Sequence, residues 1–166
     1  MQRLALNLTK MKTPINFVAF FLFFLLLTGC QRNRIFSEYK TFQDEEWQAK
    51  DKAVFEMEIT DTKNLNNVYL KVRHGDTYPY RNLFLFVNTI YPDGKEIRDT
   101  MEVVLSNQKG EWLGSGVGDI FDYKVPIKRN VRFALAGKYK FVFEQAMRVD
   151  PLPMIMDFGF EVERSN

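Results

Sequence analysis

The stretch Ala53-Val-Phe-Glu-Met-Glu-Ile59 alternates between two kinds of side chain. Alanine, phenylalanine, methionine and isoleucine occupy every second position, and both glutamates stand between them. Successive side chains of a β-strand point to opposite faces of a sheet, so this period of two predicts a strand that buries one face. The stretch decides the fold class because the same period recurs along most of the chain that follows it.

Seven further segments repeat this period, with turn signals such as Pro92-Asp-Gly94 between them. Leu83–Val87 is apolar on both faces, which is typical of a central strand. Pro126 lacks the N–H that a ladder hydrogen bond needs, so its strand is expected to end there or to lie at a sheet edge. The seven segments are 68–72, 83–87, 99–105, 121–127, 131–135, 139–143 and 154–160.

The spacing of these segments predicts an all-β fold of about eight short strands. An antiparallel β-sandwich, of the jelly-roll or Ig-like kind, suits a strand that is apolar on both faces better than the lumen of a barrel does. The chain has 166 residues, and domains of about 100–150 residues are the commonest size. We therefore expect one β-sandwich domain, over residues 51–166.

The N-terminal segment has the features of an export signal. Lys10 and Lys12 precede an apolar run of 11 residues, 17–27, which is within the length of a signal peptide and short of a bilayer span. Leu27-Thr-Gly-Cys30 then matches the lipobox of bacterial lipoprotein precursors, in which the cysteine is acylated and the leader is removed. We expect a signal peptide over 1–29, then lipidated Cys30 and a tether over 30–50. The alternative is an uncleaved anchor helix.

Removing the leader changes the charge of the chain. The whole sequence carries a net charge of +2, but residues 1–29 contain three of its 23 basic residues and none of its 21 acidic ones. The remaining part has a net charge of −1, which gives no reason to expect a nucleic-acid partner. Cys30 is the only cysteine, so an intramolecular disulfide is excluded.

No catalytic apparatus is evident in this sequence. His74 is the only histidine, and no serine elbow accompanies it. The glycine-rich run Gly110–Gly118 lacks the spacing of a phosphate-binding loop. Zinc ligands are too few, and the aspartates are too dispersed for a Ca²⁺ loop. The sequence therefore predicts no enzyme activity, no metal, no cofactor and no small-molecule substrate.

Polar and aromatic side chains beside the predicted turns are the candidates for binding a partner protein. Trp112 is ambiguous, because it could equally cover the end of the core or form an exposed contact. An alternative function is a carbohydrate-binding module, in which Trp47, Trp112 and the Tyr78/Tyr80 loop would stack on sugar rings. The candidate interaction surface comprises Arg73, Tyr78, Tyr80, Arg81, Trp112, Gln145 and Arg148.

A set of motifs follows the lipobox in one order, and together they resemble the gliding-motility lipoprotein H family (GldH) of the Bacteroidota. The resemblance covers nearly the whole chain after Cys30. The motifs are Tyr78-Pro-Tyr-Arg-Asn-Leu-Phe-Leu-Phe-Val87, Pro92-Asp-Gly94, Asp99-Thr100, Gly110-Glu-Trp112, Gly114-x-Gly116-x-Gly118, Gln145-Ala-Met-Arg148 and Asp157-x-Gly159.

The resemblance implies a small lipoprotein that is required for gliding across surfaces and is linked to type IX secretion. It also implies that protein–protein contacts support the assembly or stability of other envelope lipoproteins of that machinery, without enzymatic activity. Gln31 stands where an aspartate would signal inner-membrane retention, and the basic run 32–34 lacks the acidic residues of a surface-export signal. The expected location is the outer membrane, on its periplasmic face.

Overall fold

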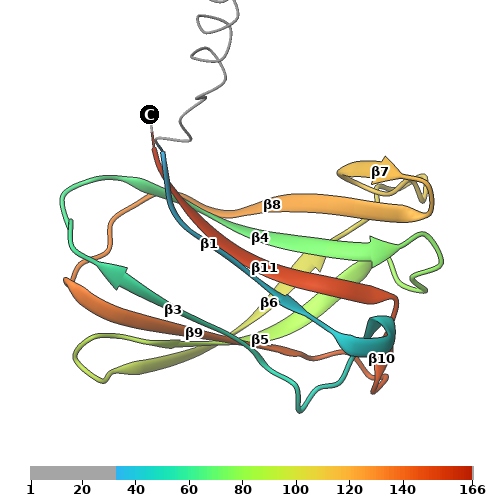
Figure 1. The fold of residues 1–166 in the computed structure, drawn as a ribbon, viewed down its shortest axis with the longest axis horizontal. Coiled ribbons are helices and arrows are strands. Elements are labelled where there is room, and N and C mark those ends of the chain that lie inside the picture. Colours follow the sequence, from blue (N-terminus) through green and yellow to red (C-terminus); the bar gives the residue numbers. More distant parts are fainter. Residues whose placement is uncertain (1–32, 166) are drawn as a thin grey trace, which may run out of the picture. The chain divides into compact units, whose positions relative to one another are not determined.

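The computed structural model describes residues 33–165, which form β-strands and one short 3₁₀ helix (Figure 1). The all-β class predicted from the period of two is confirmed, whereas the signal peptide and Cys30 lie outside the described residues. The elements are β1 (Arg34–Thr41), η1 (Gln43–Glu45), β2 (Glu46–Trp47), β3 (Ala53–Ile59), β4 (Asn66–Gly75), β5 (Asn82–Ile90), β6 (Glu96–Val104), β7 (Ser115–Val117), β8 (Ile120–Val131), β9 (Gly137–Gln145), β10 (Leu152–Pro153) and β11 (Ile155–Arg164).

Two antiparallel sheets face each other in the described part of the chain (Figure 1). One has the strand order β1-β11-β4-β8-β7 and the other the order β3-β9-β5-β6, while β2 and β10 pair only with each other. The eight long strands repeatedly cross from one sheet to the other along the chain, which is the jelly-roll form of a β-sandwich. The short strands β2, β7 and β10 bring the described total to eleven.

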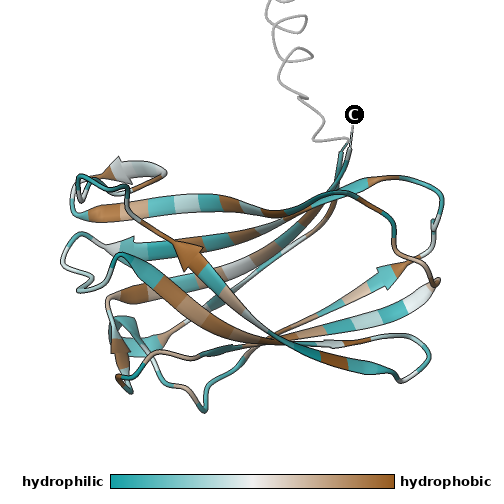
Figure 2. Cartoon of the chain, turned by 180° about the vertical axis from the view of Figure 1, so that it is seen from behind, coloured by the Kyte–Doolittle hydropathy of each residue, from teal (hydrophilic) through white to brown (hydrophobic). Residues whose placement is uncertain are grey.

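Phenylalanine rings fill the space between the sheets. Phe55 of β3 lies 5.9 Å from Phe160 of β11, measured between ring centroids, and Phe143 of β9 lies 5.0 Å from Phe158. These four side chains are at most 2 % exposed. Apolar and polar residues alternate along the strands, as Figure 2 shows, and this alternation directs the apolar side chains to one face of each sheet.

Seven of the eight predicted strands are present, and the one predicted over 131–135 is wrong. Val131 ends β8, and residues 132–136 connect it to β9. The alternation was misleading because Val131 and Phe133 pack against the core without continuing the ladder. Apolar residues of a connection that are buried against the core can therefore show the same period of two as a strand.

β1 is the one long strand among the described residues that the sequence did not predict. The spacing of three between Phe36, Tyr39 and Phe42 concealed it, yet it pairs with β11 from Arg34 to Thr41. Phe42 is buried and Phe36 packs against the core, whereas Tyr39 lies half exposed on the outer face. The folded domain therefore includes residues 34–50, and the predictions of a tether over 30–50 and a domain start at 51 are wrong for those residues.

Two predictions about strand position are confirmed. β5, which contains Leu83–Val87, lies between β9 and β6, although Phe84 on its outer face is 37 % exposed. β7 pairs only with residues 120–122 of β8. Beyond Asp122 that side of β8 has no strand among the described residues, so Pro126 lies at an edge where its missing N–H costs no ladder bond.

The two ends of the sandwich hold different parts of the chain. Arg34 lies opposite Glu163, and Asn66 lies opposite Arg164, so β1 begins where β11 ends. We call this the proximal end, because the described chain begins there; it also holds the connections 60–65, 91–95 and 132–136. The opposite, distal end holds the connections 76–81, 105–119 and 146–154.

Candidate functional site

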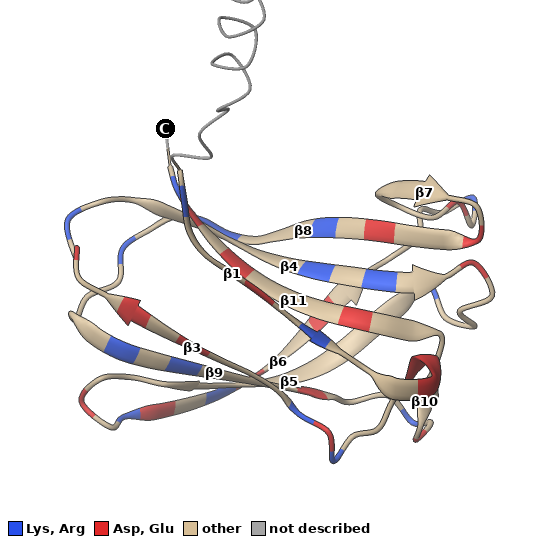
Figure 3. Ribbon diagram, viewed as in Figure 1, with Lys and Arg blue, Asp and Glu red and all other residues tan. Residues whose placement is uncertain are grey.

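Charged residues lie along β1, β4, β8 and β11 (Figure 3), and their ion pairs form a charged outer face on this sheet. Glu161 of β11 lies among them, and its side chain has no exposed surface. Lys124 Nζ donates to Glu161 Oε1 at 2.6 Å, and Lys71 Nζ contacts Oε2. Arg34 Nε lies 3.6 Å from Oε2, and Ser37 Oγ donates to it at 3.0 Å. Three cations from β1, β4 and β8 therefore enclose one carboxylate.

Burial alone would raise the pKa of Glu161. Hydrogen bonds from Lys124 and Lys71 outweigh that effect and lower the pKa from 4.5 to about 2. The carboxylate is therefore charged near neutral pH, and it ties β1 to the strands beside it. Glu161 and Glu163 alternate with buried Phe160 and Val162 and so lie on the outer face, but only the strand order brings the lysines to them.

Arg73 belongs to this charged face and not to the distal aromatic residues with which it was grouped. Its Nε donates to Asp122 Oδ1 and its Nη1 to Asp157 Oδ2, both at 2.9 Å. Thr41 Oγ1 donates to the other oxygen of Asp157. The guanidinium thus bridges β8 and β11, which is a structural role.

The distal end contains a cluster of aromatic rings that includes three predicted site residues. Trp112 packs edge-on against His74 at 4.6 Å between centroids, and Tyr78 lies 5.7 Å from His74 and from Tyr80. Tyr78 is buried and donates to Asn82 O at 2.9 Å, while Trp112 Nε1 donates to Asp76 O at 3.1 Å. Tyr80 and Trp112 are half-buried. The cluster closes the end of the core, and of the three predicted site residues in it Tyr80 and Trp112 stay accessible.

His74 is the inner-facing residue near the end of β4 and is fully buried. Its Nδ1 lies 2.8 Å from Gly75 O. Because a carbonyl can only accept, Nδ1 carries the proton and Nε2 is left without a partner among residues 33–165. Burial lowers the pKa of His74 against the opposing effects of the Gly75 hydrogen bond and Asp122. The ring is therefore neutral and part of the core.

Two more predicted site residues hold the distal connections in place. Arg81 is exposed, but its Nη2 donates to Asn107 O at 2.6 Å. Gln145 is buried: its Oε1 accepts from Met147 N at 2.9 Å, and its Nε2 donates to Val149 O at 3.2 Å. Arg148, which lies between Met147 and Val149 in the sequence, is exposed. The accessible part of the predicted surface is thus Tyr80, Trp112, Arg81 and Arg148.

The sugar-stacking platform loses two of its proposed rings. Trp47 has no exposed surface and stacks on Phe42 at 4.7 Å between centroids. Tyr78 is 3 % exposed. A ring that stacks on a sugar needs one open face, so the assignment of these two residues was wrong. Both are core residues, because β2 and the turn after β4 are pressed against the sheets.

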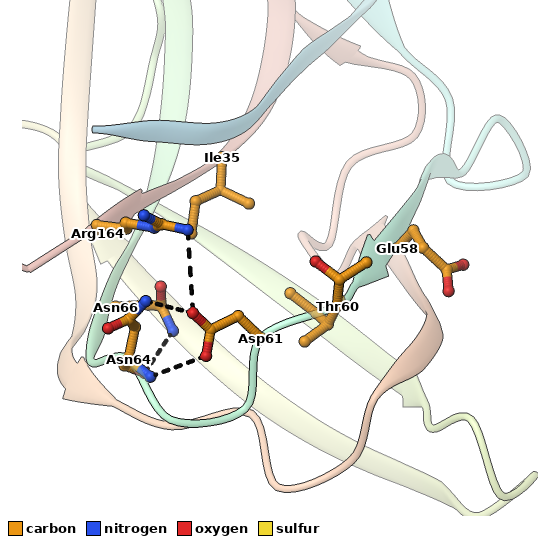
Figure 4. Close-up of a pocket in the computed structure, with 8 residues that line it drawn as sticks. Ile35, Glu58, Thr60, Asp61, Asn64, Asn66 and Arg164 are labelled. Atoms are coloured by element: carbon orange, nitrogen blue, oxygen red, sulfur yellow. Dashed lines mark hydrogen bonds and ion pairs between the residues drawn. The ribbon is translucent and has the colours of Figure 1, made fainter. Parts of the chain in front are cut away.

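The proximal end carries a small polar pocket of about 50 Å³ (Figure 4). Asp61 organises it, since its Oδ1 accepts from Lys63 N at 2.8 Å and its carboxylate also accepts from the Asn64 side chain. Arg164 Nη2 lies 4.0 Å from Asp61 Oδ2, and Ile35 forms part of the wall. The bonds close the turn between β3 and β4, so the pocket is structural. Within the described range, three or more potential metal-ligating side chains do not converge anywhere.

The fold and the site together define an all-β jelly-roll domain whose candidate site is a surface of loops. Its sequence supplies the family. The chain belongs to the GldH lipoprotein family, whose model matches residues 34–162. It is 33 % identical over 163 residues to the gliding motility lipoprotein GldH homolog of Christiangramia forsetii, covering 94 % of this chain and 99 % of that one. It is also 33 % identical over 149 residues to gliding motility lipoprotein GldH of Flavobacterium johnsoniae, covering 86 % and 92 %.

Two solved carbohydrate-binding modules have a distant likeness to the fold. One is CBM28, specific for non-crystalline cellulose, with a TM-score of 0.43, 9 % identity and coverage of 78 % of this chain and 73 % of that one. The other is TmCBM61 in complex with β-1,4-galactotriose, with a TM-score of 0.33, 12 % identity and coverage of 78 % and 88 %. Sugar binding is a property of those modules. Among the described residues, no helix has the length and hydropathy to span a bilayer.

Replacing Glu161 by Gln is expected to destabilise the domain by about 3 kcal/mol, because three cations lose the carboxylate they enclose. In the native protein the depressed pKa of Glu161 contributes stability that is present above pH 4.5 and is lost as the pH falls towards 2. Glu161→Gln should flatten that acid limb in urea unfolding curves. Glu163→Gln, which removes a partly exposed partner of Lys124, should cost at most about 1 kcal/mol. Equal losses in the two variants would contradict the assignment.

His74→Phe is expected to remove a different part of the pH dependence. The pKa of His74 is lowered in the folded state, so the unfolded chain takes up a proton first as the pH falls below 6.5. Stability from the neutral ring is present above that pH and declines below it. The free energy of unfolding, measured between about pH 7 and pH 5, should vary less in His74→Phe. Tyr78→Phe leaves His74 in place and should retain the slope.

Proposed function

We propose that this protein is an outer-membrane lipoprotein, anchored through Cys30 on the periplasmic face, that supports the gliding and type IX secretion machinery through protein–protein contacts. Membership of the GldH lipoprotein family is the observation that carries the proposal. The protein is not an enzyme in this proposal. Its partners are other lipoproteins or envelope proteins of the machinery, and it acts on no nucleic acid or small-molecule substrate.

The geometry of the domain supports tethering at one end and binding at the other. Cys30 precedes Arg34 by four residues, so covalent geometry limits their Cα separation to about 14 Å. β1 runs from Arg34 to Thr41, a length of about 27 Å, away from that point. The distal end therefore lies at the opposite end of the domain from Arg34, where the described strands begin. Confinement to a membrane raises the effective concentration of partners that share it.

The accessible distal side chains suit a protein partner. Trp, Tyr and Arg are the residue types that contribute most to binding at interfaces. Trp112 and Tyr80 are held by ring contacts with His74 and Tyr78, and Arg81 is held by Asn107. Such side chains lose little conformational entropy on binding because they are already ordered. Arg148 adds a cation beside them.

Cys30→Ala tests the anchor. The variant should lose acylation, accumulate as uncleaved precursor and leave the outer-membrane fraction, measured by mass shift and by density-gradient fractionation. Gln31→Asn, beside the same site, should be processed and located as the native protein is. An unchanged mass and membrane location in Cys30→Ala would contradict anchoring at this residue.

The Trp112→Ala/Arg148→Ala double variant tests the distal surface. In a strain that lacks the native gene, it should accumulate normally but lose most in-cell crosslinks to envelope proteins, together with spreading on agar. Loss of one interface hot-spot residue costs about 2 kcal/mol or more, which is at least about a thirtyfold loss of affinity. Leu65→Ala/Arg129→Ala, which truncates exposed side chains away from the distal end, is the control. Normal spreading and secretion in the deletion strain itself would overturn the proposed function.

A further inference from the structure

A cavity of about 330 Å³ lies between the two sheets and is the larger of the two pockets described here. Its walls are mainly apolar and include Met101 of β6, Ile127 of β8, Phe143 of β9 and Phe160 of β11. Protein cores ordinarily contain few voids larger than a water molecule, and small-molecule sites begin at about 300 Å³. The size and lining therefore indicate a site for an apolar group.

The cavity is deep as well as apolar. It is flanked by β6, the edge strand of one sheet, and by the part of β8 that β7 does not cover. Phe143 and Phe160 lie on β9 and β11, each two strands in from those edges. Neighbouring strands are about 4.8 Å apart, so the floor lies about 10 Å inside the sandwich. A narrow chain can reach it end-on.

Basic side chains line one side of the cavity. A register shift in β8 pairs Lys128 with inward-facing Val68 although Pro126 pairs with Tyr69, which turns Lys128 towards the cavity. Arg132 follows on the same side, and Asp99 of β6 lines the cavity as well. None of these three charged side chains has an ion pair or hydrogen bond with another residue of the range 33–165. The two unpaired cations outnumber the one carboxylate, so this side of the cavity has a net positive charge.

The cavity also lies at the proximal end of the domain. Asn66 pairs with Arg164 on one side and with Val131 of the cavity wall on the other. Ser165 Oγ donates to Asn130 Oδ1, and Arg164 N donates to Asn33 O. The chain therefore enters the domain within a few strand widths of the cavity. The proposed anchor at Cys30, four residues before Arg34, would attach the chain at this end.

We propose that the cavity binds a long acyl chain that carries an anionic head group, with the chain between the sheets and the head group at Lys128 and Arg132. The deep apolar cavity favours an acyl chain, and the basic side chains on one side of it favour an anionic head group. The proximity to a bilayer rests on the proposed anchor, whereas the cavity and its cations do not. A strand added by a partner protein is the rival occupant, but it would lie along β6 or β8 and leave the floor at Phe143 and Phe160 empty.

Photolabelling of the full chain in phosphatidylcholine vesicles tests this site. The probe is palmitic acid with a diazirine at the end of its chain, supplied either free or esterified in phosphatidylglycerol. Saturable labelling of β9 and β11 peptides, competed by unlabelled palmitic acid, is expected with at least one of the two. The form that labels identifies the source of the acyl chain. Cys30→Ala should still be labelled by the free acid, which separates this proposal from the anchor.

Two pairs of variants define the expected pattern. Met101→Trp fills the cavity and should reduce labelling at least about tenfold, whereas Val104→Trp, on the outer face of the same strand, should not. Lys128→Gln/Arg132→Gln should weaken binding of the free acid about two- to fivefold without affecting the matched alcohol. Lys50→Gln/Lys109→Gln makes the same charge change at exposed sites away from the cavity. The glutamine variants change only exposed side chains, so they test the site even where Met101→Trp fails to fold.

Three results would overturn the assignment. The first is labelling confined to exposed residues or not competed by unlabelled acid. The second is equal labelling of Met101→Trp and Val104→Trp when both are folded by near-UV circular dichroism. The third is the absence of labelling together with protection of β6 and β8 amides from hydrogen exchange by an envelope protein, which would assign the edges to a partner strand instead.

Discussion

The packing of phenylalanine rings between the two sheets is the interaction on which the rest of the structure depends. Cys30 is the only cysteine, so no disulfide within the chain can support the domain. Each fully buried phenylalanine contributes about 1.5–3 kcal/mol, and Phe55, Phe143, Phe158 and Phe160 meet near the middle of the sandwich. These contacts fix the distance between the sheets. The charged outer face and the distal loops are positioned by that spacing.

The sequence predicted the strands whose two faces differ in polarity. Burying one face of a strand requires apolar residues at every second position, and this pattern is visible in the sequence. β3 and β9 show it most clearly, with burial at every second position. β1 was missed because it is an edge strand whose burial does not alternate along the chain. The segment 131–135 was wrongly included since Val131 and Phe133 are buried from a connection. The local sequence pattern reflects which side chains are buried, but it does not show which strands pair.

The candidate site was harder to predict for a related reason. The Tyr78, Tyr80 and Trp112 rings were identified from their positions beside turns, and the structure brings them together. Their exposure could not be read from the sequence, because it depends on how closely the turn after β4 folds back onto His74. Glu161 alternates with buried Phe160 and Val162 and so lies on the outer face, yet it is enclosed by Lys71 and Lys124. Those cations come from strands that are adjacent in space but distant in sequence, so no local sequence motif predicts them.

The position of β1 has a mechanical consequence for a protein that is held by its N-terminus. Traction between a membrane anchor before Arg34 and a partner at the distal end would run parallel to the strands. Load in that direction shears the ladder between β1 and β11, so the hydrogen bonds from Arg34 to Thr41 and the ion pairs around Glu161 resist together. Traction across the strands would instead separate those bonds one at a time. Under such traction, β1 would pass the force to β11, the strand that lies beside it.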